Sequence, residues 1–352
     1  MPRASRWRAG CNAAVMAVRT LTMMTFLAVT QACPPDQPGP DAGMAGPDAT
    51  PPRPTLAANQ LVFDSTRSSN NHEIFVMKTD GTSATRLTTD LAYENWWPRI
   101  SPDRTKVLFY RSPAGNPENY AEASLWVMNA DGTGVIQLRA KGQDGWSAQG
   151  HGEWSPDGTR IAMFGSAGPA LEIFVTDASG TNPVQYTRRG GVNTDVSWSP
   201  DGTKLLFNGC PGTPCVPASY EIYVMPAVAL ASPTRLTTDA LASYDPYFSP
   251  GGDKLAWLVN VDPSANVIPG TSTSLGRWAI RIADASGSNA RYLIDDGNIN
   301  SKPAWSLDGQ TLYFHRMVPP DYRFKVFRLG QNGTGLSDLT LGAAGINEHP
   351  SN

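Results

Sequence analysis

The chain has 352 residues, of which 40% are hydrophobic and 17% charged, a balance typical of a globular protein rather than a disordered one. Its 28 Lys and Arg face 31 Asp and Glu, and the net charge of −3 argues against a nucleic-acid binder and against a polybasic membrane-surface protein. The 33 glycines and 30 prolines exceed average usage and indicate a β protein with many turns.

Residues 1–32 have the pattern of a secretory signal peptide. Basic residues precede an apolar run, 20–29, that is too short to span a bilayer. Ala32 stands directly before Cys33, as in the bacterial lipobox, where the cysteine becomes the acylated first residue; ordinary cleavage nearby, without acylation, is the alternative. The pattern predicts an exported protein, periplasmic or at the surface of the bacterial envelope, that meets the membrane only through a lipid anchor.

Residues 33–56 form the next segment. They are rich in Pro, Gly, Ala and Asp and lack the apolar residues from which a core is built. Such a composition is typical of an extended, semi-rigid linker. A tether after a candidate lipidated Cys33 would hold the following domain, residues 57–352, away from the membrane.

Two phrases recur through residues 57–352. The first is a Ser-Pro-Asp-Gly turn followed by an apolar run, and its serines are Ser101, Ser155, Ser199, Ser249 and Ser306. The second reads "EIFVMKTDGTSATRLT" in its first copy, and its six copies begin at Glu73, Ser124, Glu172, Glu221, Ala279 and Lys325. The shortest interval between the serines is 44 residues (155 to 199) and the longest is 57 (249 to 306), close to the length of a four-stranded propeller blade.

Each phrase is typical of a β-hairpin, because two short apolar runs flank a tight-turn signal. No segment after the N-terminus keeps a helical apolar period, so the body is predicted to be all-β. The two ends of the repeat region each hold part of one repeat. Residues 60–65 lack the innermost strand that precedes the equivalent segment in other repeats, and residues 346–352 match that innermost strand but nothing after it. We therefore predict six blades, closed by pairing of the N- and C-terminal strands.

The Trp-Ser-Pro-Asp-Gly turn, the apolar strand, the Asp-Gly-Thr turn and the "RLT" ending together resemble the repeat of the TolB-type β-propeller. The resemblance covers roughly residues 57–352. It implies an all-β fold, a six-bladed β-propeller of four-stranded antiparallel blades, in a family whose members decorate the bacterial envelope.

Two cysteines remain in the body of the chain, Cys210 and Cys215, in a Gly- and Pro-rich insertion between two strands. Export permits disulfides, so we predict that they form one that staples the loop. The alternative, half of a zinc site, would need two further ligands, and no Cys or His lies nearby in sequence.

One column of residues is a candidate ligand site. Alignment of the six innermost strands places the following residues at one position: Trp97, His151, Asp195, Asp245, Lys302 and His349. Two positions earlier stand Asn95, Gln149, Asn193, Ser243, Asn300 and Asn347. Both columns could line the mouth of the central channel and bind a ligand, or their polar groups could cap backbone groups where the strands begin. The two other histidines, His72 and His315, fall outside the column and are predicted at strand ends.

No catalytic motif is present: the Asp-Gly turns lack calcium-loop spacing, and there is no nucleophile elbow, Walker loop or dinucleotide fingerprint. The favoured hypothesis is a monomeric binding or scaffolding module without a cofactor, whose partner is an envelope protein, a peptide or a glycan. Long insertions at 112–123, 208–219 and 262–277 are candidate contact loops. The alternative is an enzyme acting in the channel, such as a metal-dependent polysaccharide (uronate) lyase or a hydrolase.

Overall fold

A computed structural model describes residues 53–352 except 212–214, 217–218, 239, 268–271 and 319. The chain divides into two units, Met1–Pro51 and Pro52–Asn352. The predicted signal peptide, Cys33 and almost all of the predicted linker lie outside the described residues. The described part of the second unit contains no α-helix, and its 3₁₀ turn η1 (Gln143–Gly145) is only three residues long, so the predicted all-β class is confirmed.

The strands form four sheets with mostly antiparallel pairing, two of four strands and two of eight. The first sheet has the order β24-β1-β2-β3 and consists of β24 (Asn347–Ser351), β1 (Gln60–Ser65), β2 (Glu73–Lys78) and β3 (Thr85–Arg86). The second four-stranded sheet consists of β4 (Tyr93–Ile100), β5 (Lys106–Pro113), β6 (Ser124–Asn129) and β7 (Ile136–Arg139), in that order. The last strand of the chain therefore pairs with the first, in antiparallel register.

Each eight-stranded sheet contains two antiparallel groups of four strands. The eight-stranded sheet that comes earlier in the chain consists of β8 (Gln149–Trp154), β9 (Arg160–Ala167), β10 (Ala170–Asp177), β11 (Val184–Gln185), β12 (Val192–Trp198), β13 (Lys204–Cys210), β14 (Glu221–Pro226) and β15 (Thr234–Arg235). The second holds β16 (Ala242–Phe248), β17 (Lys254–Asp262), β18 (Arg277–Asp284), β19 (Arg291–Ile294), β20 (Ile299–Trp305), β21 (Thr311–Met317), β22 (Phe324–Gly330) and β23 (Ser337–Asp338). The groups are joined by one parallel residue pair in each sheet, Leu171 with Val192 and Trp278 with Ile299.

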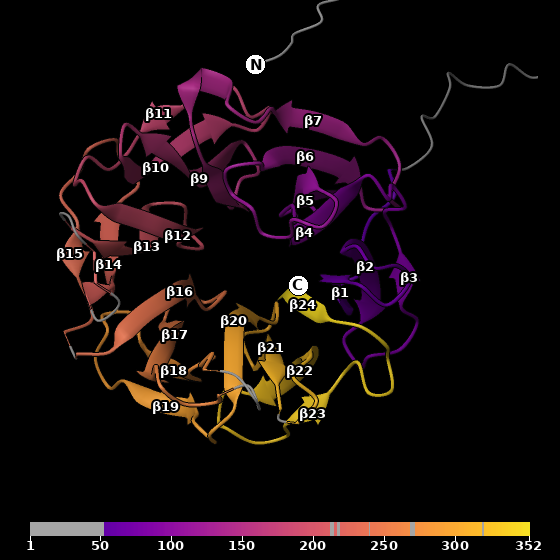
Figure 1. The fold of residues 1–352 in the computed structure, drawn as a ribbon. Coiled ribbons are helices and arrows are strands. Elements are labelled where there is room, and N and C mark those ends of the chain that lie inside the picture. Colours follow the sequence, from indigo (N-terminus) through magenta and orange to yellow (C-terminus); the bar gives the residue numbers. More distant parts are fainter. Residues whose placement is uncertain (1–52, 212–214, 217–218, 239, 268–271, 319) are drawn as a thin grey trace, which may run out of the picture. The chain divides into compact units, whose positions relative to one another are not determined.

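Figure 1 shows these sheets around a common centre, with β12, β16, β20 and β24 among the strands that face it. The fold brings the innermost strand of each group together although they are spread along the whole chain. Buried apolar side chains fill the space between neighbouring groups; one such cluster joins Ala162 and Ile173 to Trp198 and Leu205. The indole Nε1 of Trp198 also donates to Glu153 O at 3.2 Å, which links β12 to β8.

The first repeated phrase builds the turn after five of the six innermost strands, β4, β8, β12, β16 and β20. Ser155 Oγ donates to Asp157 Oδ1 at 2.5 Å, and the same carboxylate accepts the backbone N–H of Thr159 at 3.0 Å. Ser199 and Asp201 make the equivalent bond. These contacts satisfy polar groups within a tight turn, so the aspartates are turn residues, as expected.

The second phrase ties the outer strands of a group together. Thr187 Oγ1 accepts the backbone N–H of Ile173 at 2.8 Å and donates to the carboxylate of Glu172 at 2.6 Å. The threonines of two other copies, Thr88 and Thr237, make the same pair of contacts. The recurring Glu and "RLT" residues therefore hold the short outermost strand in place.

Candidate functional site

The six residues of the predicted column share an unusual backbone conformation. Their φ values are 57° for Trp97, 52° for His151, 50° for Asp195, 49° for Asp245, 55° for Lys302 and 47° for His349. The pairing register of each innermost strand shifts at this point, as in a β-bulge. A left-handed residue in a bulge re-aims its side chain, which explains how six side chains from six strands turn toward one another.

Trp97 is the centre of the column and is 1% exposed. Its ring stacks on the ring of His151 with centroids 4.0 Å apart and lies 5.0 Å from the ring of His349. Lys302 Nζ lies 4.3 Å from the Trp97 ring centroid, as in a cation–π contact, and 2.9 Å from Asp245 Oδ1. The structure thus brings the six column residues together into one cluster, in which Lys302 is half-buried and the other five are buried.

His151 lies between two oxygen groups. Its Nδ1 contacts the carboxylate of Asp195, and its Nε2 lies 2.6 Å from the hydroxyl of Tyr120. Burial, followed by the negative charges of Glu118 and Asp195, raises the pKa of Tyr120 well above its ordinary value. The three residues form a Tyr–His–Asp chain in which a proton can be held at either end of the imidazole.

Sequence reasoning missed Tyr120 and Glu118, although it identified their loop, 112–123, as a candidate contact segment. Glu118 Oε1 lies 3.0 Å from His349 Nε2, and Tyr120 contacts His151. The repeat pattern could not reveal them, because a residue in an insertion has no equivalent in other copies. The sequence did show an acidic and a phenolic side chain in an insertion predicted to contact a ligand, and that was the one indication of their role.

A cavity of about 450 Å³ opens beside this cluster. Its polar floor includes His151, Asp195, Asp245 and Lys302, and its walls combine aromatic and aliphatic side chains. The ring centroids of Tyr220 and Tyr244 lie 5.0 Å apart, and those of Tyr244 and Trp278 5.6 Å apart, which makes one continuous aromatic wall. Four of the six column residues therefore line the cavity, and the other two, Trp97 and His349, pack behind them.

The two floor carboxylates differ electrostatically. Burial and the neighbouring charge of Asp195 raise the pKa of Asp245, although Lys302 acts in the opposite direction. Burial also disfavours the charged form of Asp195, but the contact with His151 outweighs it and lowers the pKa of Asp195. At neutral pH this floor offers hydrogen-bond acceptors next to a lysine ammonium group, inside an apolar enclosure.

The second column does not reach the cavity. Asn95, Asn193, Asn300 and Asn347 are all 0% exposed. Each accepts a hydrogen bond from an arginine: Arg111 to Asn95 at 2.8 Å, Arg189 to Asn193 at 3.1 Å, Arg316 to Asn300 at 2.7 Å and Arg67 to Asn347 at 2.6 Å. Their side-chain amides also donate to nearby backbone or carboxylate oxygens. The structure therefore places these asparagines in the bonding between strands, and Gln149 and Ser243 are buried as well.

A separate, smaller cavity of about 210 Å³ is lined by Arg99, Glu153 and Tyr247 among others, and shares no lining residue with the larger one. Arg99 pairs with Glu153 and is 6% exposed, and its guanidinium lies 4.3 Å from the centroid of the Trp97 ring. Trp97 therefore contacts a lining residue of each cavity, His151 of the larger one and Arg99 of the smaller one.

The remaining histidines are buried. His72 lies directly before β2, as predicted, with Nδ1 3.1 Å from Glu94 Oε2. His315 lies inside β21 rather than at a strand end, which corrects the sequence-based expectation, and its Nδ1 accepts the backbone N–H of His349 at 3.1 Å. The apolar pattern around His315 continues through it, so its interior position could have been expected.

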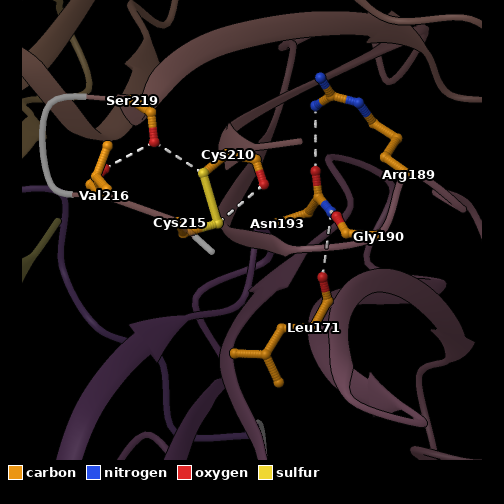
Figure 2. Close-up of a disulfide and its surroundings, with 8 residues drawn as sticks. All are labelled: Leu171, Arg189, Gly190, Asn193, Cys210, Cys215, Val216 and Ser219. Atoms are coloured by element: carbon orange, nitrogen blue, oxygen red, sulfur yellow. Dashed lines mark hydrogen bonds between the residues drawn. A yellow bond between two sulfur atoms is a disulfide. The ribbon is translucent and has the colours of Figure 1, made fainter. Parts of the chain in front are cut away.

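Cys210 and Cys215 form a disulfide, as predicted, with their Cα atoms 5.8 Å apart (Figure 2). Cys210 ends β13, and its Sγ lies 2.8 Å from Ser219 Oγ. Figure 2 also shows Asn193 on the neighbouring strand, bonded to Arg189 and to Leu171 O. The bridge links the end of β13 to Cys215 within the long insertion 208–219.

No protein-family profile matches the chain, and no curated protein is similar to it in sequence. Solved structures are similar in fold. TolB from Acinetobacter baumannii superposes with a TM-score of 0.64 at 18% identity, over 83% of this chain and 66% of that one. A chain of a nidogen/laminin complex gives 0.61 at 12% identity, over 83% and 97%. An oligogalacturonate lyase in complex with manganese gives 0.51 at 12% identity, over 80% and 73%.

The chain thus spans just under two thirds of the Acinetobacter TolB chain. Where the second unit is described, no helix has the length and apolar character needed to cross a bilayer. The sheets around a common centre and the similarity to TolB structures agree with the resemblance seen in the repeats. Residues 53–352 have the fold of a TolB-like β-propeller.

Proposed function

We propose that this protein is an exported β-propeller that binds a ligand in the 450 Å³ cavity, and that it acts as a binding or scaffolding module of the cell envelope. The observation that carries the proposal is the cavity itself, where an aromatic wall of Tyr220, Tyr244 and Trp278 stands over a charged floor. Enclosed sites with apolar walls and a few convergent polar groups are typical ligand sites.

The cavity favours a compact ligand or a chain end over a threaded polymer. Its volume falls in the range of small-molecule sites, roughly 300–1,000 Å³. We infer that Trp97 separates the two cavities, because it contacts His151 of the larger one and Arg99 of the smaller one, so a bound chain would end near the floor. The end of a peptide or of a glycan, with rings or apolar groups against the wall and polar groups toward Asp245 and Lys302, fits this description.

Binding screens with peptides and oligosaccharides test this function. Trp278→Ala should weaken binding of any hit at least tenfold, because it removes a large face of the wall, and Asp245→Asn should weaken ligands with donor groups. Tyr292→Ala is the matched control, since Tyr292 is 38% exposed and lies outside the cavity. A ligand whose affinity is insensitive to Trp278→Ala but sensitive to changes in the long loops would place the binding surface elsewhere.

The number of blades and the way the propeller closes are part of this proposal. We infer six four-stranded blades, because each of six antiparallel groups contributes one innermost strand with a left-handed residue in the shared column. The pairing of β24 with β1 supports closure by the two ends of the chain. Export by a signal peptide over 1–32, a linker over 33–56, acylation of Cys33 and a monomeric state complete the proposal, supported by the sequence pattern alone.

The Tyr120–His151–Asp195 chain favours a second candidate, acid–base catalysis in the same cavity. An imidazole between a carboxylate and a hydroxyl can move a proton to or from a bound substrate. An oligogalacturonate lyase is among the proteins of similar fold, so acidic oligosaccharides are the first substrates to test. Cleavage of a polyuronate that is lost in Tyr120→Phe and His151→Ala, while ligand binding persists, would establish catalysis; binding without turnover would leave the module function alone.

A further inference from the structure

A buried cluster of two carboxylates and one histidine lies where the first and last strands meet. Asp64 of β1 is paired directly with Glu348 of β24, and His349 follows with the left-handed backbone of the column. Asp64 is 0% exposed, Glu348 9% and His349 1%. Each offers one ligand atom, and these three atoms all lie within 4.8 Å of one another.

The donor set suits a divalent transition metal. Two carboxylates and one imidazole are ligands that Zn²⁺ and Mn²⁺ accept. His349 Nδ1 and Asp64 Oδ1 lie 2.8 Å apart, close to the separation of two neighbouring ligands around a metal with bonds of about 2.1 Å. The group needs little rearrangement to surround an ion.

A second observation points to a ligand at this place. Asp64 Oδ2 is fully buried and has no hydrogen-bond partner among the described residues. A buried carboxylate oxygen left unpaired costs free energy, so such atoms normally bind a donor or a cation. Asp64 accepts from His349 and from the backbone of Trp97 through Oδ1 alone, which leaves Oδ2 available for coordination.

The surroundings resemble the outer contacts of a metal site. Glu118 Oε1 lies 3.0 Å from His349 Nε2, so it would orient the imidazole and leave Nδ1 for the ion. His72 Nε2 lies 3.3 Å from Glu348 Oε2, and Glu94 contacts the other nitrogen of His72. Four carboxylates, of Asp64, Glu94, Glu118 and Glu348, thus face two histidines, and a cation would balance the excess negative charge.

We propose that Asp64, Glu348 and His349 bind one divalent transition-metal ion, Zn²⁺ or Mn²⁺, that joins the first and last strands of the propeller. None of the three residues lines the 450 Å³ cavity, so the metal site is distinct from that cavity, although His349 packs on Trp97 behind the lining. The ion would stabilise the closure of the fold, because it binds only when β1 and β24 are paired. The competing occupant is a proton shared by His349 and Asp64.

Elemental analysis and thermal unfolding of the purified exported chain test the proposal. We expect about one equivalent of Zn²⁺ or Mn²⁺, removal by a chelator, and a rise in Tm of at least about 3 °C when the ion is restored. Asp64→Asn and Glu348→Gln should abolish both the bound metal and the shift. Glu172→Gln is the matched control, a buried carboxylate 2% exposed on another sheet, which should keep the metal and the shift whatever it does to the basal Tm.

If a variant fails to fold, the metal content and Tm of the wild-type protein still test the proposal. Wild-type chain that carries no metal and shows no change in Tm with either ion overturns it and leaves the proton-bridged pair. A shift that persists unchanged in folded Glu348→Gln would also overturn it, because the ion would then bind elsewhere.

Discussion

The hydroxyl of Tyr120 lies 2.6 Å from Nε2 of His151, so a loop residue without an equivalent in the other repeats is bonded to a residue of the repeated column. The same loop supplies Glu118 to His349. The insertion 112–123 is therefore part of the central cluster, and changes in it should affect the cluster rather than the surface alone.

Tyr120→Phe should destabilise the fold by roughly 1–3 kcal/mol, because it leaves one nitrogen of the buried His151 without its partner. Chemical denaturation monitored by tryptophan fluorescence measures the change in the free energy of unfolding. Tyr292→Phe, which alters an exposed ring, should cost less than about 0.5 kcal/mol. Equal costs for the two variants would show that the contact with His151 contributes nothing to stability.

Gly132→Ala should be more destabilising than Gly115→Ala. Both glycines have positive φ, 87° and 80°, so both variants carry the left-handed penalty of roughly 1–2 kcal/mol. A Cβ at Gly132 would lie 2.6 Å from Leu87 O, whereas at Gly115 nothing lies within 4 Å. The close approach adds about 1–3 kcal/mol, and the difference in unfolding free energy between the two variants measures it.

Acid should weaken the turns after the innermost strands. The hydrogen bond from Ser155, and next the one from the backbone of Thr159, lower the pKa of Asp157 from 3.8 to about 2. Asp201, bonded to Ser199 and Thr203, has its pKa lowered in the same way, also to about 2. A depressed carboxyl pKa contributes stability above the unfolded value, which is lost as the pH falls through about 2.

The double variant Asp157→Asn, Asp201→Asn therefore tests the charged part of these turns, because asparagine keeps an acceptor oxygen. Its stability should be below wild type at pH 7 and should fall less between about pH 4 and pH 2. Denaturant midpoints across this range are the measurement. Parallel pH profiles for the two proteins would mean that other carboxylates cause the acid dependence.

Replacement of Cys210 and Cys215 by serine should lower the free energy of unfolding by about 2 kcal/mol, the loop-entropy value for so short a ring. Wild-type protein in a reducing agent should lose the same amount, and the double variant should not respond to the reductant. Alkylation and mass spectrometry of the unreduced protein should find no free thiol in this pair. Free thiols there would contradict the predicted bridge.

Cys33→Ala should release the protein from the membrane fraction of expressing cells, because the acylated cysteine is its proposed anchor. Metabolic labelling with a fatty-acid analogue provides the second readout. Wild-type protein that is soluble after export and remains unlabelled would favour ordinary signal cleavage.

The sequence by itself determined the fold class and the alignment of the column. The recurring Ser-Pro-Asp-Gly and "RLT" phrases indicated hairpins, since turn chemistry and strand periodicity are local properties. Equivalent positions in stacked repeats must lie at equivalent places around the axis. For that reason Trp97, His151, Asp195, Asp245, Lys302 and His349 could be placed together before the structure was known.

Tertiary structure decided what those residues meet. The left-handed bulge that turns His151 and its counterparts inward depends on strand pairing, which no single residue reveals. Asn95 and Asn193 looked like channel residues because they share the alignment, yet arginines bind them away from the cavity: Arg111 from the neighbouring strand β5, and Arg189 from the connection before β12. Contacts such as Asp64 with His349, separated by 285 residues, arise only when the chain closes on itself, because long-range pairing rather than local propensity brings those charges together.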